Sequence, residues 1–480
     1  MRNTKLQPEI VWHFFDEITQ IPRPSKKEHQ ISAYLKAFAK ENQLECKEDQ
    51  VGNLLIVKEP TDREKQRPTI VLQCHMDMVC EKNATVEHDF ETDPIQTYVD
   101  GDWIKAKGTT LGADNGAGMA AALALLSSDS ILHGKIEALF TVDEETGLNG
   151  AFGLEAGFFE GKYLLNLDGE DGIYIGCAGG IDTKALFDFE LIDAPKDKFY
   201  FKVSVSGLAG GHSGDDINKG RANAIQILVR YLQILQTKYD LVISEIEGGN
   251  LHNAIPRAAS AYVGVSFKDK ENVRIELNHF IYEVENEFNF AESKMRIDLD
   301  SEDRPETCID TQSARQLLNA LYICPNGVIT MNPEFENLVE TSSNLASVKR
   351  IGEKQIQVVL SHRSSVESAK LDICNRIDIL FSSMGAKVSH GTGYPGWKPN
   401  LKSPLLTLSI QAYEDLFHEK PYVRAVHAGL ECGLFLDKYP WLDMISFGPV
   451  ILDAHSPDER LSISGMQKFW AHLNEIVSRL

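Results

Sequence analysis

Three segments of the sequence are apolar over almost their whole length, and each of them ends in acidic side chains. They are "TIVLQCHMDMV" (69–79), "KIEALFTVDEE" (135–145) and "KYLLNLDGE" (162–170). A strand that is apolar on both faces is typical of a parallel sheet with helices on each side. The three runs therefore predict the centre of a buried α/β sheet.

Helical segments alternate with these strands. In "SKKEHQISAYLKAFAKEN", Ser25 stands three residues before Glu28, a spacing that predicts a capping box at the start of a helix. The segment "NGAGMAAALALLSS" (115–128) is rich in alanine and leucine, which favour helix. The alternation of strands and helices predicts a doubly wound α/β domain with a mostly parallel sheet.

The pattern changes at about residue 189. The segment "KFYFKVSVSG" alternates apolar and polar residues, as a half-exposed strand does, and "GTGYPGWKPN" (391–400) has the glycine and proline content of a linker. We therefore expect the α/β domain in two parts, 1–188 and 398–480, interrupted by an inserted α+β domain at 189–397.

Composition limits the partners of the chain. It has 48 basic and 70 acidic residues and a net charge of -22, which argues against binding to nucleic acid or to an anionic membrane. The first residues contain no apolar stretch of signal-peptide type, and no apolar run approaches the roughly 20 residues that span a bilayer. The eight cysteines form no Cys-x-x-Cys pair. These features predict a soluble cytoplasmic protein with free thiols.

Polar side chains follow each of the three predicted strands. His75 and Asp77 end the first strand, the acidic triplet 143–145 ends the second, and Asp168 ends the third. Ligands of open α/β sheets bind beyond the carboxyl ends of the strands, so these groups are expected to converge. Asp114, just before a helix, and His455, in a loop, offer further ligands. Histidine and carboxylate without cysteine is the ligand set of a hydrolytic zinc, manganese or cobalt site.

The spacing within the motifs predicts a division of roles. Residues i and i+2 of a strand face the same side, so Asp77 can accept the second ring N–H of His75 and orient the ring. In the acidic triplet, one glutamate can bind a metal while its neighbour acts on the attacking water. Taken alone, each motif is better explained as a solvated loop, and the same holds for His212 among its glycines and for Arg363 at a strand end.

The order of the motifs resembles a known group of enzymes. "HMDMV", "GADNGAG", "DEETG", "NLD" and "AHSPDE" resemble the di-metal aminoacylase/carboxypeptidase clan of peptidases. "IPRPSKKEHQIS", "GLAGGHSGDDI", "HNAIPR" and "HAGLECG" resemble, within that clan, the bacterial dipeptidases that cleave aminoacyl-histidine dipeptides. The resemblance extends over nearly the full length of the chain.

The resemblance implies a two-zinc centre, with cobalt or manganese as alternatives. Asp114 would bridge the two ions and would be followed by a cis peptide bond. One ion would also be bound by His75 and Asp168, and the other by Glu145 and His455.

The resemblance also implies roles for residues that do not bind metal. Glu144 would be the general base, and Asp77 would support His75. The inserted domain would be a lid, whose His212 would help to hold the oxyanion and whose Asn253 and Arg363 would help to bind substrate. Glu431 in "HAGLECG" is our own candidate for the partner of the substrate amino group.

The expected reaction is hydrolysis of unblocked Xaa-His dipeptides, such as β-alanyl-histidine. An aminoacylase, a tripeptidase, a catalytically silent binding protein and a metal-storage protein are the alternatives. Retention of Glu144 and of all five ligands argues against a silent protein, and open coordination positions argue against storage. The oligomeric state stays open, with a homodimer as one alternative.

Overall fold

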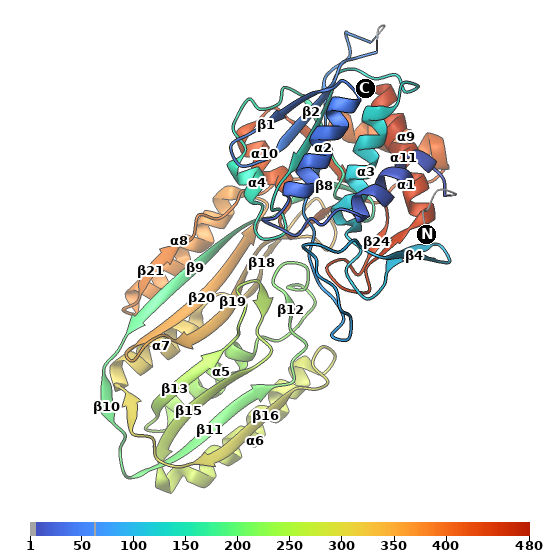
Figure 1. Ribbon diagram of the computed structural model, residues 1–480. Helices are drawn as coiled ribbons and strands as arrows, with labels where there is room; N and C mark the ends of the chain where they lie inside the picture. The colour runs from blue at the N-terminus through green and yellow to red at the C-terminus, as the bar shows by residue number, and fades with distance from the viewer. Residues whose placement is uncertain (1–5, 62–63) are drawn as a thin grey trace. The chain divides into compact units, whose positions relative to one another are not determined.

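The computed structural model describes residues 6–61 and 64–480 (Figure 1). The chain divides into two compact units. The first unit contains residues 1–177, 397–425 and 430–480, and the second contains residues 178–396 and 426–429.

In the described part of the chain, the first unit is built on an eight-stranded sheet. In spatial order the strands are β1 (Glu45–Glu48), β2 (Leu54–Lys58), β6 (Ile136–Thr141), β3 (Ile70–His75), β7 (Tyr163–Asn166), β23 (Asp443–Phe447), β8 (Ile173–Cys177) and β22 (Val423–Val426). The central strands β6, β3, β7 and β23 run parallel, whereas β1, β2 and β8 pair antiparallel. Every residue of β3 and β6 is buried, as their apolar sequences predict.

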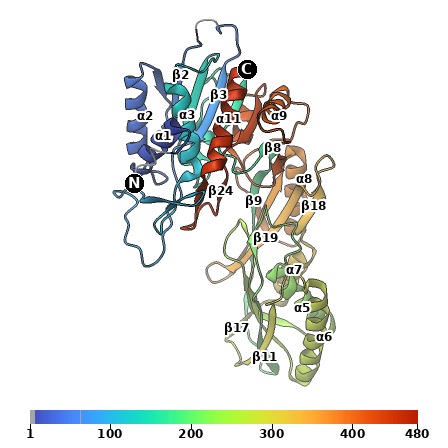
Figure 2. The ribbon, with the colours of Figure 1, turned by 90° about the vertical axis from the view of Figure 1, so that its right-hand side faces the viewer.

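Helices pack around this sheet (Figures 1 and 2). Helix α3 contacts both β3 and α1, which explains why its alanine-rich sequence is buried almost throughout. The helices are α1 (Glu9–Thr19), α2 (His29–Glu41), α3 (Ala113–Ser127), α4 (Asn149–Gly153), α9 (Pro404–Phe417), α10 (Glu431–Lys438) and α11 (Ile463–Arg479). The predicted α/β fold with a parallel sheet centre is confirmed.

A small sheet carries one loop of the later site. It contains β24 (Ile451–Leu452), β25 (Arg460–Ser462), β5 (Trp103–Ala106) and β4 (Thr97–Asp100), in that order. Strands β24 and β25 pair antiparallel, so the segment 453–459 between them is the loop of a hairpin.

The predicted capping box at Ser25 is wrong. Helix α2 begins at His29, with Glu28 at the N-cap position and no side-chain cap. The Ser25 hydroxyl instead donates a hydrogen bond to Asp77 Oδ2 at 2.7 Å. Glu28 Oε1 accepts from the Asp143 amide at 3.0 Å. Both side chains are taken up by the acidic turns, contacts that the local spacing does not reveal.

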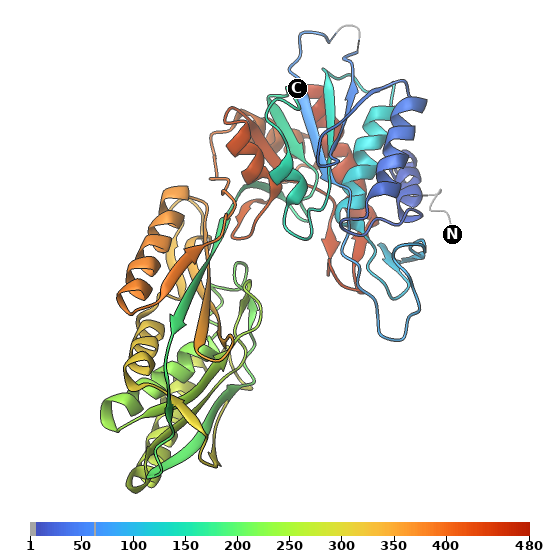
Figure 3. The ribbon, with the colours of Figure 1, turned by 60° about the vertical axis from the view of Figure 1, so that its left-hand side comes forward.

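The second unit contains a nine-stranded sheet among the described residues, and all the pairs in it are antiparallel. Figures 2 and 3 show its helices gathered on one face of that sheet. The strands are β16 (Arg296–Glu302), β11 (Lys198–Ser206), β15 (Ala259–Ser266), β13 (Val242–Gly248), β19 (Val339–Arg350), β20 (Gln355–Ser364), β9 (Gly179–Asp188) and β21 (Lys387–His390), with β18 (Gly327–Met331) paired to β19. The helices are α5 (Ala224–Lys238), η1 (Phe267–Asp269), α6 (Lys270–Phe288), α7 (Thr311–Ile323) and α8 (Glu367–Ser383). Two short pairs, β10 (Leu191–Asp193) with β17 (Thr307–Ile309) and β12 (Gly211–His212) with β14 (Ala254–Ile255), complete it.

Strand β9 belongs to the second unit, although the sequence division at 188/189 places it in the α/β domain. Its residues pair with β20 over the whole strand, and this long-range pairing is not visible in the local pattern. Within the described residues, no helix has the length and apolar character needed to cross a membrane.

The core of the second unit contains a buried histidine that must stay neutral. His362 in β20 is fully buried, and its two ring nitrogens lie 3.0 Å from the hydroxyls of Ser343 and Thr183. Burial lowers its pKa from 6.5 to about 4.

Acid is therefore expected to destabilise the second unit through His362. A group with a lowered pKa resists protonation in the folded state, so its stabilising effect is present above pH 6.5 and is lost as the pH falls towards 4. At about 1.4 kcal/mol per pKa unit, the loss at about pH 5 is on the order of 2 kcal/mol. Urea unfolding should show that the free energy of unfolding falls less between pH 8 and pH 5 for His362→Gln than for wild type. Substitution of the exposed His13 is the control, and equal losses in wild type and His362→Gln would contradict this assignment.

Candidate metal centre

The first element of the site is the end of β3. His75 is the last residue of this strand, and its side chain is 1% exposed. Its Nδ1 lies 3.3 Å from Asp77 Oδ1, and its Nε2 points away from Asp77 towards two other carboxylates. Asp77 therefore lies beside the ring, but His75 Nδ1 is buried without a hydrogen-bond partner among the described residues, and the orienting role of Asp77 stays a prediction.

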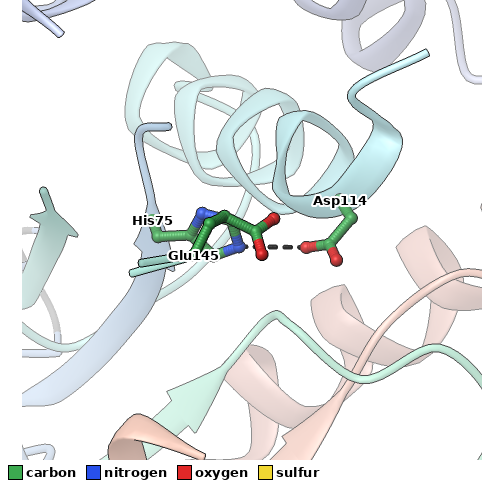
Figure 4. A group of neighbouring side chains, drawn as sticks. All are labelled: His75, Asp114 and Glu145. Atoms are coloured by element: carbon green, nitrogen blue, oxygen red, sulfur yellow. Dashed lines mark hydrogen bonds and ion pairs between the residues drawn. The ribbon is translucent and has the colours of Figure 1, made fainter. Parts of the chain in front are cut away.

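Asp114 lies between two histidines at the start of α3. Its Oδ1 is 2.9 Å from His75 Nε2, and its Oδ2 is 3.1 Å from His455 Nε2. Figure 4 shows Asp114 and His75 pointing towards each other, with Glu145 beside them. The peptide bond from Asp114 to Asn115 is cis, as the family resemblance implied.

The acidic triplet forms a tight turn after β6. Asp143 has a left-handed backbone with φ of 49°, and its carboxylate accepts hydrogen bonds from Thr146 and Asn149 at 2.6 and 2.7 Å. Its charge is therefore used within the turn. The amides of Glu144 and Glu145 donate to the two oxygens of Asp77 at 3.0 and 3.2 Å. Asp77 therefore fixes the backbone of the turn.

The two glutamates of the turn have different surroundings. Glu145 Oε2 lies 3.1 Å from His455 Nε2, whereas its Oε1 is buried without a hydrogen-bond partner among the described residues. In the part of the chain that the structure describes, no group donates a hydrogen bond to the Glu144 carboxylate.

Asp168 completes the cluster just after β7. Its Oδ1 lies 3.4 Å from His75 Nε2 and accepts a hydrogen bond from the Asn115 side chain. The structure therefore brings together all five residues that the sequence proposed as metal ligands. Each histidine faces Asp114 and one further carboxylate: Asp168 for His75, and Glu145 for His455.

The histidines of the cluster are held in their charged form by these carboxylates. Burial lowers the pKa of His75, but Asp168 and Asp114 outweigh burial and raise the pKa well above its ordinary value. Hydrogen bonds to Asp114 and Glu145 raise the pKa of His455 to about 11. Protons on the two rings thus supply the positive charge that the carboxylates require.

The acids respond differently according to their contacts. Burial raises the pKa of Glu144 well above its ordinary value, and burial together with Asp114 raises the pKa of Asp168 to about 6. Burial also raises the pKa of Asp77, but the neighbouring His75 ring and the hydrogen bond from Ser25 outweigh it and hold the pKa at about 2. Contacts within the protein therefore stabilise the ionised form of Asp77.

The cluster fits divalent metal ions. Ligand atoms of His75, Asp114 and Glu145 all lie within 4.8 Å of one another, and the buried Glu145 Oε1 is left for a partner that the protein does not supply. Imidazole and carboxylate are the donors that zinc and related metals prefer in hydrolytic sites.

Glu431 is a buried acid that contacts β3 and β6, the strands that lead to His75 and to the acidic triplet. Its carboxylate is 1% exposed, and its Oε2 accepts hydrogen bonds from Gln73 at 2.5 Å and Thr141 at 3.0 Å. Its Oε1 is buried without a partner among the described residues, and burial raises the pKa of the group to about 7. The proposed contact with a substrate amino group stays a prediction.

The other predicted site residues lie in the second unit. His212 in β12 places its Nδ1 3.2 Å from Asp215 and its Nε2 3.4 Å from the Arg363 guanidinium. The carbonyl of Asn253, just before β14, accepts from the Ser213 amide at 2.8 Å. The structure therefore brings His212 and Arg363 together and places Asn253 in the turn that leads into β14, the strand paired with β12.

Sequence reasoning missed several residues that support these groups. Tyr394 accepts a hydrogen bond from Arg363 Nη1 at 2.9 Å, although its segment reads as a linker. The buried Arg23 and Glu459 hold the backbone around Asp114. Both occur in motifs that carry the family resemblance, "IPRPS" and "AHSPDE", and this was the available signal.

Comparison with known proteins gives a consistent result. Residues 71–479 match the model of peptidase family M20/M25/M40. The chain is 39% identical over 479 residues to the cytosol non-specific dipeptidase of Escherichia coli strain K12, with 99% of each chain covered.

Solved structures agree with this assignment. The crystal structure of aminoacylhistidine dipeptidase from Vibrio alginolyticus is 39% identical, with a TM-score of 0.92 and coverage of 99% of this chain and 98% of that one. An aminopeptidase from Bacillus cereus, 16% identical over 98% of each chain, shares the fold with a TM-score of 0.59. The predicted peptidase clan is confirmed: the chain belongs to peptidase family M20/M25/M40 and is a hydrolase of peptide bonds.

Proposed function

We propose that this protein is a dipeptidase that uses two divalent metal ions. The observation that carries the proposal is the position of Asp114, with one oxygen towards each of two histidines and a further carboxylate beside each histidine. Two relatives that match over nearly the whole chain are named as dipeptidases.

The five clustered residues would hold the metals in two sets. Asp114 would be shared, His75 and Asp168 would complete one set, and Glu145 and His455 would complete the other. When bound, such a pair of ions polarises the substrate carbonyl and lowers the pKa of a coordinated water towards about 7. Zinc suits these donors, and cobalt or manganese are alternatives.

Glu144 is the proposed general base. Its carboxylate is free of hydrogen-bond donors among the described residues, and its backbone is fixed by the bond from its amide to Asp77. Burial raises its pKa, which makes it a better proton acceptor than an ordinary carboxylate. Glu144 would take the proton of the attacking water and then give it to the leaving amine.

Substrate recognition is proposed for residues of the second unit. Arg363 can bind a free C-terminal carboxylate through a bidentate fork, and Asn253 would help to hold the substrate. His212 would donate to the oxyanion as the peptide carbonyl becomes tetrahedral. These roles require the second unit, as a lid, to reach the substrate during the reaction.

Unblocked dipeptides are the proposed substrates, with Xaa-His dipeptides among them. Arg363 would select a free carboxylate, and Glu431 is the candidate partner of the free amino group. The two relatives named above are described as non-specific and as aminoacylhistidine-cleaving, so a preference for C-terminal histidine follows only the second. The name of the first also supports a cytosolic location for this protein.

The first prediction from the proposed function concerns metal binding. Protein stripped with a chelator should lose activity and should recover it with zinc, cobalt or manganese. The reloaded protein should contain two metal ions per chain, as measured by elemental mass spectrometry. His455→Ala should bind fewer ions, whereas His13→Ala, an exposed position on α1, should bind as wild type.

The affinity for metal should also depend on pH. Metal must displace protons from the histidines, whose pKa values are raised, so affinity should be greater at pH 8 than at pH 6. Full activity of exhaustively metal-free protein would refute the proposal.

The second prediction separates the two adjacent glutamates. Glu144→Gln should retain both metal ions and lose roughly 10²–10⁴-fold in kcat, the scale of general acid–base catalysis. Glu145→Gln is the matched control and should lose metal. If Glu144→Gln lost metal but turned over normally once saturated, the two roles would have to be exchanged.

The third prediction concerns substrate termini. Free dipeptides should be cleaved much faster than N-acetylated or C-amidated forms and faster than tripeptides. Arg363→Met should raise KM for free dipeptides and abolish the difference between free and C-amidated substrates. Preference for N-acyl amino acids would instead support the aminoacylase alternative, with the metal chemistry intact.

The fourth prediction concerns His212. His212→Ala should lower kcat for dipeptides without changing the metal content. An unchanged kcat would leave His212 without a part in the reaction.

A further inference from the structure

Two buried charged residues of the first unit take no part in the proposed chemistry. Arg23 precedes α2 and is 3% exposed, and Glu459 lies in the hairpin loop that also carries His455 and is 2% exposed. Burying a charge is costly unless hydrogen bonds replace the lost water. Their contacts are therefore informative.

The Glu459 carboxylate accepts hydrogen bonds from four consecutive backbone amides. Its Oε2 lies 2.7 Å from the Leu111 amide and 3.0 Å from that of Gly112. Its Oε1 lies 2.8 Å from the Ala113 amide and 3.3 Å from that of Asp114. These bonds are charge-assisted, and the negative charge is favourable at the start of α3. Glu459 thus joins the His455 loop directly to the backbone of Asp114.

Arg23 holds the same segment from another direction. Its Nη1 donates to the carbonyls of Met76 and Asp77 at 3.1 and 2.6 Å, and its Nη2 donates to the carbonyl of Gly112. The guanidinium therefore joins the end of β3, which carries His75, to the segment that carries Asp114.

Glu459 and Arg23 both form hydrogen bonds with the backbone of Gly112. Its amide donates to Glu459 and its carbonyl accepts from Arg23. Its φ of 68° is left-handed, and a Cβ there would stand 2.6 Å from Arg23 Nη2 and 2.8 Å from Met78 Sδ. The close approach of Arg23 therefore depends on glycine at this position.

We infer that Glu459 and Arg23 are positioning residues that fix three distant parts of the chain as one metal-binding frame. The inference rests on the proposed function, because it takes His75, Asp114 and His455 as metal ligands. Neither residue would touch metal or substrate. Their bonds would set the positions of the ligands before metal arrives. Outer partners of this kind typically contribute about 10–100-fold to metal affinity.

Glu459→Gln is the principal test. The substitution keeps the shape of the side chain but replaces one acceptor oxygen with an NH₂ group, which would face two backbone N–H donors. Zinc affinity, measured by competition with a chelator, should fall about 10–100-fold. In metal-free protein, the amides of residues 111–114 should exchange hydrogen faster than in wild type. The absorption spectrum of the cobalt-loaded variant should also change, because the ligands would be less well fixed.

Glu137→Gln is the matched control in the same unit. Glu137 is also 2% exposed, and its Oε2 accepts from the amides of Glu160 and Gly161 at 2.8 and 2.9 Å. It lies in β6 at the end opposite Glu144. Glu137→Gln should lower thermal stability but bind zinc with wild-type affinity.

Two further variants keep the test decisive if Glu459→Gln does not fold. Arg23→Lys retains the charge but cannot reach three carbonyls with one fork, and Gly112→Ala leaves both charges in place while displacing the segment between them. Both should weaken zinc binding. Wild-type zinc affinity in the folded variants, with stability lowered as in Glu137→Gln, would overturn the positioning role. Failure of wild type itself to bind zinc, cobalt or manganese would instead refute the proposed function.

Discussion

Negative charge concentrated at one edge of the sheet is the constraint on which the rest of this structure depends. Asp114, Glu145 and Asp168 meet two histidines at distances of 2.9 to 3.4 Å, and Glu144 lies in the same turn as Glu145. Carboxylates packed this closely repel one another and lose water on burial. Protons on the histidines offset part of that cost, and divalent cations would offset it more completely.

The protein separates acids that it satisfies itself from acids that it leaves available. Asp77 and Glu459 accept backbone amides through both of their oxygens. Asp143 accepts from side chains of its own turn, so these acids serve the structure. Glu144 and Glu145 each keep an oxygen without a donor among the described residues. This contrast is the physical basis for assigning metal binding and proton transfer to that pair.

Local sequence was sufficient to predict the features that depend on periodicity and on the ends of strands. Apolar runs located β3, β6 and β7, and the rule that ligands gather at the carboxyl ends of parallel strands brought His75 and Asp168 together correctly. Predictions failed where a contact joins distant segments. Ser25 bonds to Asp77 instead of capping α2, and β9 pairs with β20, a strand far along the chain. Glu459 was missed for the same reason, since its four partners, the amides of residues 111–114, are equally remote in sequence.

Anomalous diffraction at the zinc absorption edge, from crystals of zinc-loaded protein, tests the central claim most directly. Two anomalous peaks are predicted, one on each side of the Asp114 carboxylate. One peak should lie against His75 and Asp168, and the other against His455 and Glu145. A single peak, or peaks away from Asp114, would contradict a two-metal centre at this edge of the sheet.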